Sequence, residues 1–338
     1  MSTARPLHPE PAGRPAPAAR HALEEALFEV KRVIVGQDAM LERLLVALLA
    51  GGHVLLEGVP GLAKTLTVKT VAEVLGGTFK RVQFTPDLVP SDLVGTRVYH
   101  PDTGSFDVEL GPVFGNFLLA DEINRAPAKV QSALLEVMQE RQVTIGGTSF
   151  RVPDPFLVLA TQNPIESEGT YVLPEAQTDR FLFKLLVGYP SRGEEAAVVG
   201  RSLGPIIRVR ELLSPESLLE HRREVAQVAV DREVIGYAVA LADATRHPAR
   251  HGLHDLDGLV QFGASPRGPI GLVHAARALA LLRGRGYAVA HDVRDLAPDV
   301  LRHRLVLSYD ALADGVSPDD LIARVLAAVP MPEHELHR

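Results

Sequence analysis

The first half of the chain alternates short apolar runs with amphipathic segments. Apolar runs typical of buried strands occupy residues 53–56, 81–84, 117–120 and 156–161. Apolar positions recur at the three-to-four residue spacing of a helix over residues 38–49, 64–75 and 127–139. Because strands that alternate with helices build a parallel sheet covered on both faces, this half predicts an α/β fold.

The pattern changes near residue 190. From Ser191 onward no strand is convincing, and helical spacing occurs over residues 192–202, 215–226, 232–246, 269–283 and 293–308. At the other end, residues 1–20 contain five prolines and lack the apolar stretch of a secretory signal, which indicates a disordered tail. The sequence therefore predicts this tail, an α/β core over residues 21–190 and an all-α domain over residues 191–338.

Composition narrows the class of protein. The chain has no cysteine, which excludes disulfides, cysteine-ligated metals and a cysteine nucleophile. Its net charge of −7 disfavours a dedicated nucleic-acid binder, because phosphate contacts normally require a basic surplus. The longest apolar stretch, from Leu44 to Gly52, is far shorter than the ~20 residues of a membrane helix. We therefore expect a soluble, cytoplasmic protein without membrane insertion.

A glycine-bearing turn follows the first predicted strand. The turn and the start of the next helix read Gly58-Val59-Pro60-Gly61-Leu62-Ala63-Lys64-Thr65-Leu66. A strand, such a turn and a helix that opens with Lys-Thr form a phosphate-binding loop, whose amides and lysine bind nucleotide phosphates and whose threonine ligates Mg²⁺. Ala63 stands where the usual pattern has glycine, and so small a residue still lets the backbone approach phosphate. The loop predicts binding of ATP and Mg²⁺.

Two carboxylates end the apolar run at residues 117–120. Asp121 and Glu122 are expected at the carboxyl edge of the sheet, where open α/β sheets bind ligands. Asp121 would hold Mg²⁺, and Glu122 would polarise the water that attacks the γ-phosphate. Another apolar run leads to Asn163, which in this setting would orient that water or contact the γ-phosphate. A turn asparagine before Pro164 is the alternative.

These motifs and several longer strings resemble the MoxR family of AAA+ ATPases. The strings are QFTPDLVPSDLVG, GPVFGNFLLADEINRAPAKVQSALLEVMQERQVT, LPEAQTDRF, GASPRG and DVRDLAPDVLRHRLVLSYDAL. The resemblance extends from about Val33 to about Gly315, nearly the whole chain. It implies an AAA+ core with a helical lid, and the family also shows alanine at the position of Ala63.

The resemblance implies further nucleotide contacts. Val35, Gly36 and Gln37 match the segment that lines the adenine. Arg180 matches the arginine finger that reaches a neighbouring subunit's ATP, where its permanent planar charge suits the transferring phosphoryl group. Arg267 matches the second sensor of the lid. Whether Arg267 contacts its own nucleotide or a neighbour's stays open.

Two insertions typical of the family's helix-2-insert clade have counterparts in this chain. Residues 86–111 contain the turn-forming string Asp102-Thr103-Gly104-Ser105. Residues 142–152 alternate apolar and polar positions around Gly146-Gly147. Both segments predict β-hairpins. The second tip carries no basic residue, which weakens the interpretation of the chain as a DNA-translocating motor.

Two further groups are not assigned to the predicted site. Asn124 and Arg125 follow the paired carboxylates and either relay the nucleotide state to a neighbour or form a local ion pair. Arg302, His303 and Arg304 are expected to decorate a lid helix.

By resemblance, the protein hydrolyses ATP at the subunit interfaces of a ring, expected to be a hexamer, and remodels or matures partner proteins. That work often inserts a metal or cofactor. Such ATPases act with a separate protein that carries a von Willebrand factor A (VWA) domain and a metal-ion-dependent adhesion site (MIDAS). The alternatives are a metal-chelatase motor subunit and an ATP-gated scaffold with little turnover. A nucleic-acid motor is disfavoured by the net charge and the hairpin tip.

Overall fold

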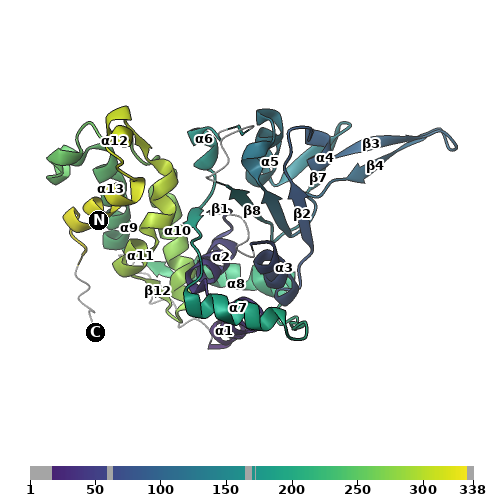
Figure 1. Cartoon of the computed structure of the whole chain (residues 1–338), viewed down its shortest axis with the longest axis horizontal. Coiled ribbons are helices and arrows are strands. Elements are labelled where there is room, and N and C mark those ends of the chain that lie inside the picture. The colour runs from purple at the N-terminus through teal and green to yellow at the C-terminus, as the bar shows by residue number, and fades with distance from the viewer. Residues whose placement is uncertain (1–16, 59–63, 164–169, 172, 333–338) are drawn as a thin grey trace, which may run out of the picture.

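A parallel sheet with helices on both faces lies beside a mainly helical C-terminal part (Figure 1). The computed structural model describes residues 17–58, 64–163, 170–171 and 173–332. Of the predicted tail, residues 1–16 lie outside the described residues, and residues 17–20 belong to the first helix. Within the described ranges, no helix is long and apolar enough to cross a membrane.

Five parallel strands form the sheet, in the order β2-β5-β8-β1-β9. Their bounds, in that order, are Phe79–Gln83, Phe117–Asp121, Leu157–Gln162, Val54–Glu57 and Phe183–Leu186. The hydrophobic pattern does not predict β9, because this short strand contains Lys184 and adjoins the change of pattern at residue 190. β2 is a partly exposed edge strand, so the expectation of a buried strand there is wrong.

Successive residues of each strand face two separate apolar cores. In β1, Val54 and Leu56 belong to one core and Leu55 to the other. The first core is covered by α1, α2 and α3, which span Pro17–Lys31, Asp38–Ala50 and Lys64–Val74. The second is covered by α4 and α5, which span Pro90–Val94 and Ala128–Glu140.

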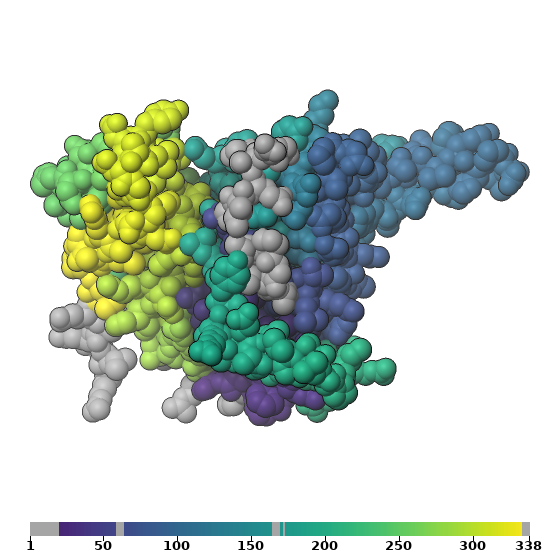
Figure 2. Space-filling view, in the orientation of Figure 1, coloured from purple at the N-terminus to yellow at the C-terminus, as the bar shows by residue number. Residues whose placement is uncertain are grey.

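Both insertions form the predicted β-hairpins. β3 (Gly95–His100) pairs with β4 (Ser105–Leu110), and this hairpin projects from the body of the molecule (Figure 2). β6 (Gln142–Ile145) pairs with β7 (Thr148–Arg151). The two hairpins touch: Gly146 lies so close to Arg97 of β3 that a side chain at position 146 would collide with it.

The C-terminal part is helical, as predicted, and contains short strands in addition. Its helices are α7 (Arg192–Ser202), α8 (Pro215–Gln227), α9 (Arg232–Arg246), α10 (Arg267–Leu282), α11 (Ala290–Leu301), α12 (Tyr309–Ala313) and α13 (Pro318–Ala328). Short ladders pair β10 (Ala229–Val230) with β12 (Tyr287–Ala288), and β11 (Val260–Phe262) with β13 (Val306–Leu307). The helix expected over residues 293–308 ends at Leu301 and is followed by a 3₁₀ turn, η4 (Arg302–Arg304).

One apolar core joins the sheet to the C-terminal helices. Leu272 in α10 and Val300 in α11 belong to the same cluster as Val54 in β1. The buried Arg43 in α2 also crosses this boundary, with an ion pair of 2.9 Å to Asp299 in α11. These contacts connect segments on both sides of residue 190, and the domain boundary there stays a prediction.

Candidate nucleotide site

The residues predicted to bind phosphate meet at the carboxyl edge of the sheet. Gly58 follows β1, Asp121 ends β5 and Asn163 follows β8, and these three strands are neighbours. Lys64 is the first residue of α3. Residues 59–63 of the predicted loop, from Val59 to Ala63, lie outside the described residues. The topology thus gathers groups that lie far apart along the chain.

Lys64 lies against the loop backbone and faces acidic residues. Its Nζ donates a hydrogen bond of 2.5 Å to the carbonyl oxygen of Gly58. Burial lowers the pKa of Lys64, while the negative charges of Asp121, Glu122 and Glu57 oppose that shift. The ammonium group therefore lies at the edge where the carboxylates and the loop meet.

Thr161 in β8 connects the two carboxylate residues. Its hydroxyl donates to Asp121 Oδ1 at 2.7 Å and accepts from the backbone N–H of Glu122 at 2.8 Å. Glu122 has a φ of 57°, a left-handed conformation that costs a non-glycine residue about 1–2 kcal/mol. The bond from its own N–H to Thr161 holds Glu122 in this conformation.

Three residues that the sequence analysis does not assign to the site hold the carboxylates in place. Arg81 Nη2 lies 2.6 Å from Asp121 Oδ2. Gln83 Nε2 and Arg125 Nη1 both donate to Glu122 Oε2, at 2.8 and 3.0 Å. Of the two roles expected for Arg125, the structure therefore shows the local ion pair. The signal for the other two is their spacing, since residues i and i+2 of a strand share one face.

An apolar pocket of about 410 Å³ lies beside the start of α3. Val35, Gln37 and Leu66 line it. Gly36 has a φ of 68°, and a side chain there would collide with Glu194 of α7. Within the described chain, the buried Gln37 Oε1 accepts no hydrogen bond. An acceptor in such a pocket suits a ligand with a hydrogen-bond donor, such as the amino group of adenine.

The other wall of this pocket comes from beyond residue 190. Val198 in α7, and Ile206 and Ile207 after it, face the same space. Figure 2 shows α7 lying across α1, and Arg201 donates to the Lys31 carbonyl oxygen at 3.4 Å. The sequence does not single out these residues, because their apolar character predicts a packed helix as readily as a pocket wall.

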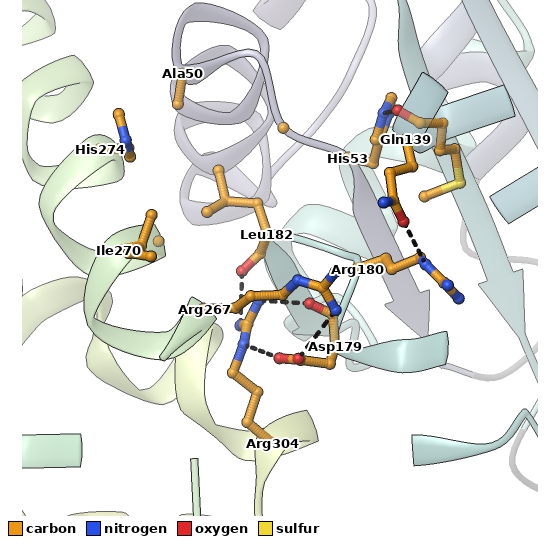
Figure 3. A pocket seen from close by; sticks show the side chains of 13 residues that line it. Ala50, His53, Gln139, Asp179, Arg180, Leu182, Arg267, Ile270, His274 and Arg304 are labelled. Atoms are coloured by element: carbon orange, nitrogen blue, oxygen red, sulfur yellow. Dashed lines mark hydrogen bonds and ion pairs between the residues drawn. The ribbon is translucent and has the colours of Figure 1, made fainter. Parts of the chain in front are cut away.

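The two predicted arginines lie at the opposite, amino edge of the sheet. Leu182, two residues beyond Arg180, donates from its backbone N–H to the carbonyl oxygen of His53 at 2.8 Å, immediately before β1. Arg180 Nε donates to Gln139 Oε1 at 3.1 Å. Figure 3 shows Arg180 and Arg267 together in the lining of one pocket, which has a volume of about 270 Å³.

Asp179, which precedes Arg180 in the chain, pairs with Arg267. Its Oδ2 lies 3.4 Å from Arg267 Nη1 and accepts from the hydroxyl of Ser265 at 2.8 Å. That hydroxyl in turn accepts from the backbone N–H of Arg267, the first residue of α10, at 3.1 Å. The structure thus brings Arg180 and Arg267 together and places both away from the carboxyl-edge residues of the same chain.

The basic turn η4 is packed between the lid and the sheet. His303 and Arg304 are 9% and 7% exposed. Arg304 Nε lies 2.8 Å from Asp179 Oδ1, and Arg302 Nη1 donates to the Lys184 carbonyl oxygen at 2.6 Å. The expectation that these residues decorate a lid helix is therefore wrong. A run of charged residues predicts exposure unless the distant partners that bury it are known.

The oxygen donors at the carboxyl edge fit a small divalent cation. The hydroxyl of Thr65 and the carboxylate of Asp121 are ligand types that Mg²⁺ prefers. Among the residues that the structure describes, no group of three or more His, Asp or Glu side chains could hold a metal ion. Proteins usually hold Mg²⁺ through one or two carboxylates, with substrate phosphates and water as its other ligands.

The fold and these residues define an ATPase of the AAA class with a helical lid. Residues 53–183 match the family described as "ATPase family associated with various cellular activities (AAA)", and residues 256–325 match "AAA lid domain". The chain is 58% identical to "Chaperone MoxR1" of Mycobacterium tuberculosis, over 98% of this chain and 88% of that one. It is 36% identical to "Protein MoxR" of Methylorubrum extorquens, over 90% and 93%.

A solved structure has the same fold over nearly its full length. A candidate ATPase from Cytophaga hutchinsonii superposes with a TM-score of 0.89 at 47% identity, over 94% of this chain and 96% of that one. The chain belongs to the MoxR family of AAA ATPases. Its enzymatic activity is the hydrolysis of ATP.

Proposed function

We propose that ATP is hydrolysed at joints between copies of this chain, where one copy binds the nucleotide and the next supplies Arg180 and Arg267. The observation that carries this proposal is the separation of Lys64 and Arg180 onto opposite edges of one sheet. β1 spans four residues between those edges, about 13 Å at 3.3 Å per residue. An arginine side chain is too short for that distance, so Arg180 serves the nucleotide of another copy.

At the carboxyl edge, the side chains suit phosphoryl transfer to water. Lys64 binds the β- and γ-phosphates. Glu122, oriented by hydrogen bonds from Gln83 and Arg125, accepts a proton from the attacking water. Asn163 helps to orient that water. The buried Gln37 acceptor and the apolar pocket around it receive the adenine.

Thr65 and Asp121 would hold Mg²⁺ beside these groups. When bound, this ion neutralises charge on the β- and γ-phosphate oxygens. Asp121 Oδ1 already accepts a hydrogen bond from Thr161, which fixes the carboxylate.

The two arginines stabilise charge on the neighbour's nucleotide. An arginine supplied by a second subunit accelerates such reactions by about 10³–10⁵-fold, so an isolated copy is expected to be almost inactive. Arg267 is proposed to act on the same neighbouring nucleotide, because Asp179 holds it beside Arg180. Head-to-tail joints of this kind close into a ring, for which we propose six copies.

For its biological role, we propose chaperone-like remodelling of partner proteins, together with a separate VWA protein that carries a MIDAS. The near full-length similarity to "Chaperone MoxR1" supports the remodelling role. Insertion of a metal or cofactor into the client is part of the same proposal. A metal-chelatase motor and an ATP-gated scaffold remain the alternative predictions.

The deciding experiment measures ATPase activity and particle size together. Wild type and Glu122→Gln are assayed over a protein concentration series, with light scattering in each nucleotide state. We expect activity per subunit to rise cooperatively as rings form, and Glu122→Gln to bind ATP and assemble without turnover. Assembly of the wild type without turnover would favour the scaffold. Activity independent of concentration and particle size would contradict the interfacial mechanism.

A further inference from the structure

The turn η4 of the lid binds the segment that carries Arg180, residue by residue. His303 Nε2 donates to the Phe181 carbonyl oxygen at 3.0 Å, and Thr178 Oγ1 donates to the His303 carbonyl oxygen at 3.4 Å. Arg304 Nη2 donates to the carbonyl oxygens of Asp179 and Phe181 at 3.1 and 2.7 Å. One short lid turn thus holds the backbone on both sides of Arg180.

Arg304 makes the largest share of these contacts. Its side chain is 3% exposed, and its guanidinium pairs with Asp179 Oδ1 at 2.8 Å. Nη1 also donates to the Leu182 carbonyl oxygen at 3.3 Å and contacts the Val300 carbonyl oxygen. Burial lowers the pKa of Arg304 to about 10, and the charge of Asp179 opposes that shift. So buried a charge is tolerated only with a complete set of partners, and a lysine cannot reproduce this planar fork.

The Asp179 carboxylate connects Arg304 to Arg267, and the Asp179 backbone continues directly into Arg180. One oxygen of its carboxylate accepts from Arg304, and the other faces Ser265 and Arg267 at the start of α10. Figure 3 shows Asp179 between Arg267 and Arg304, with Arg180 extending from the next position in the chain. A displacement of Arg304 would therefore shift Arg180 and Arg267 together.

We propose that Arg304 is a positioning residue for hydrolysis in the neighbouring subunit: through Asp179 it fixes Arg180 and Arg267 as one rigid unit. The inference rests on the proposed interfacial function and adds to it a residue outside the nucleotide contacts. It assigns to the lid turn the task of setting the geometry of a site that belongs to another copy.

The first test is Arg304→Lys in the full-length chain, which keeps the charge and removes the planar fork. Small displacements of a catalytic group cost on the order of 10²-fold in rate, so we expect kcat to fall by about that factor. KM for ATP and ring formation should stay near wild type, because the carboxyl edge is untouched. The matched control is Arg324→Lys, an exposed lid arginine that pairs with Asp255 at 2.9 Å and should leave kcat unchanged.

A mixing experiment separates positioning of the neighbour's site from a general structural defect. Arg304→Lys subunits keep an intact carboxyl edge, and Glu122→Gln subunits keep an intact amino edge. Random co-assembly of the two gives intact joints at about a quarter of the positions, so the mixture should be far more active than either variant alone. If Arg304 acted on its own nucleotide, or only on folding, mixing would restore nothing.

The same mixture with Arg180→Ala in place of Arg304→Lys tests the underlying function. Recovery with Arg180→Ala but not with Arg304→Lys would overturn the positioning role alone. No recovery with Arg180→Ala would overturn the interfacial mechanism itself. Should Arg304→Lys fail to fold, Asp179→Asn tests the same link, since it keeps the side-chain volume and removes the shared charge. A wild-type kcat in a folded Asp179→Asn variant would contradict the proposal.

Discussion

The two edges of the sheet carry different chemistry. At the carboxyl edge, the acids Asp121 and Glu122 face Lys64, and each acid also pairs with one arginine of the same chain. At the amino edge, arginines surround a single acid, Asp179. The two groups of side chains are too far apart to act on one nucleotide within one chain, and in the proposed assembly they meet between two chains. Under the proposed mechanism, one copy therefore contains two half-sites, and each half-site is completed by a neighbouring copy.

The edges also differ in how they are built. The carboxyl edge is formed by the ends of the strands and by the start of α3, and both lie within the first half of the chain. The amino edge needs the lid, because α10 and η4 supply Arg267 and Arg304. A variant at one edge should therefore fail in a different way from a variant at the other.

The largest expected effect comes from exchanging a key residue at each edge. Arg180→Ala should lower kcat by about 10³–10⁵-fold, which corresponds to about 4–7 kcal/mol, with ATP affinity retained. Lys64→Ala should instead abolish ATP binding, because it removes the lysine that contacts the phosphates. Equilibrium binding of a fluorescent ATP analogue alongside steady-state kinetics separates the two. Loss of nucleotide affinity in Arg180→Ala would remove the distinction between the edges.

A smaller effect is expected in the pH dependence of the free energy of unfolding, through His53 at the amino edge. His53 is buried, accepts from the Val158 N–H at 3.0 Å, and has a pKa lowered to about 3, chiefly by desolvation. In the unfolded chain, histidine binds a proton near pH 6.5, so the neutral His53 ring contributes fully to the free energy of unfolding above that pH. As the pH falls from 6.5 toward 3, this contribution decreases by about 1.4 kcal/mol per pH unit.

Chemical unfolding of wild type and His53→Gln between pH 7 and pH 5 measures this contribution. The free energy of unfolding should depend less steeply on pH in the variant. The buried His303, whose pKa is also lowered by burial, supplies part of the remaining slope. His100→Gln, at an exposed histidine of the projecting hairpin, is the matched control for the exchange of histidine for glutamine. An unchanged slope in His53→Gln would contradict the assignment.

The smallest effect concerns the carboxyl edge. Gln83→Leu removes one hydrogen bond to the Glu122 carboxylate and leaves the one from Arg125. We expect kcat to fall about tenfold, or ~1.4 kcal/mol, with KM unchanged. Lys80→Gln, on the opposite face of the same strand, should match wild type in steady-state assays. A change in KM instead of kcat would place Gln83 in nucleotide binding.

The sequence predicts the carboxyl edge better than the amino edge, for a physical reason. Motifs such as the one ending in Lys64, or Asp121-Glu122, are local, and parallel strands bring their ends together whatever the side-chain detail. Arg304 gives no local signal, because its partner Asp179 lies 125 positions away along the chain. Gln83 is missed for a related reason, since a polar residue on an edge strand predicts exposure. Long-range polar contacts are not encoded in periodicity.

The apolar core that the sheet shares with α10 and α11 has a mechanical meaning. Close-packed interiors are stiff and transmit displacement with little compression. The ion pair from Arg43 in α2 to α11 adds to this shared core. We therefore expect the sheet and the lid of one copy to move together as one stiff body. In the proposed ring, we expect the interfaces between subunits, where the nucleotide would bind, to deform more easily than the subunits themselves. We therefore expect each hydrolysis event to tilt a whole subunit and to pass that motion to its neighbours around the ring.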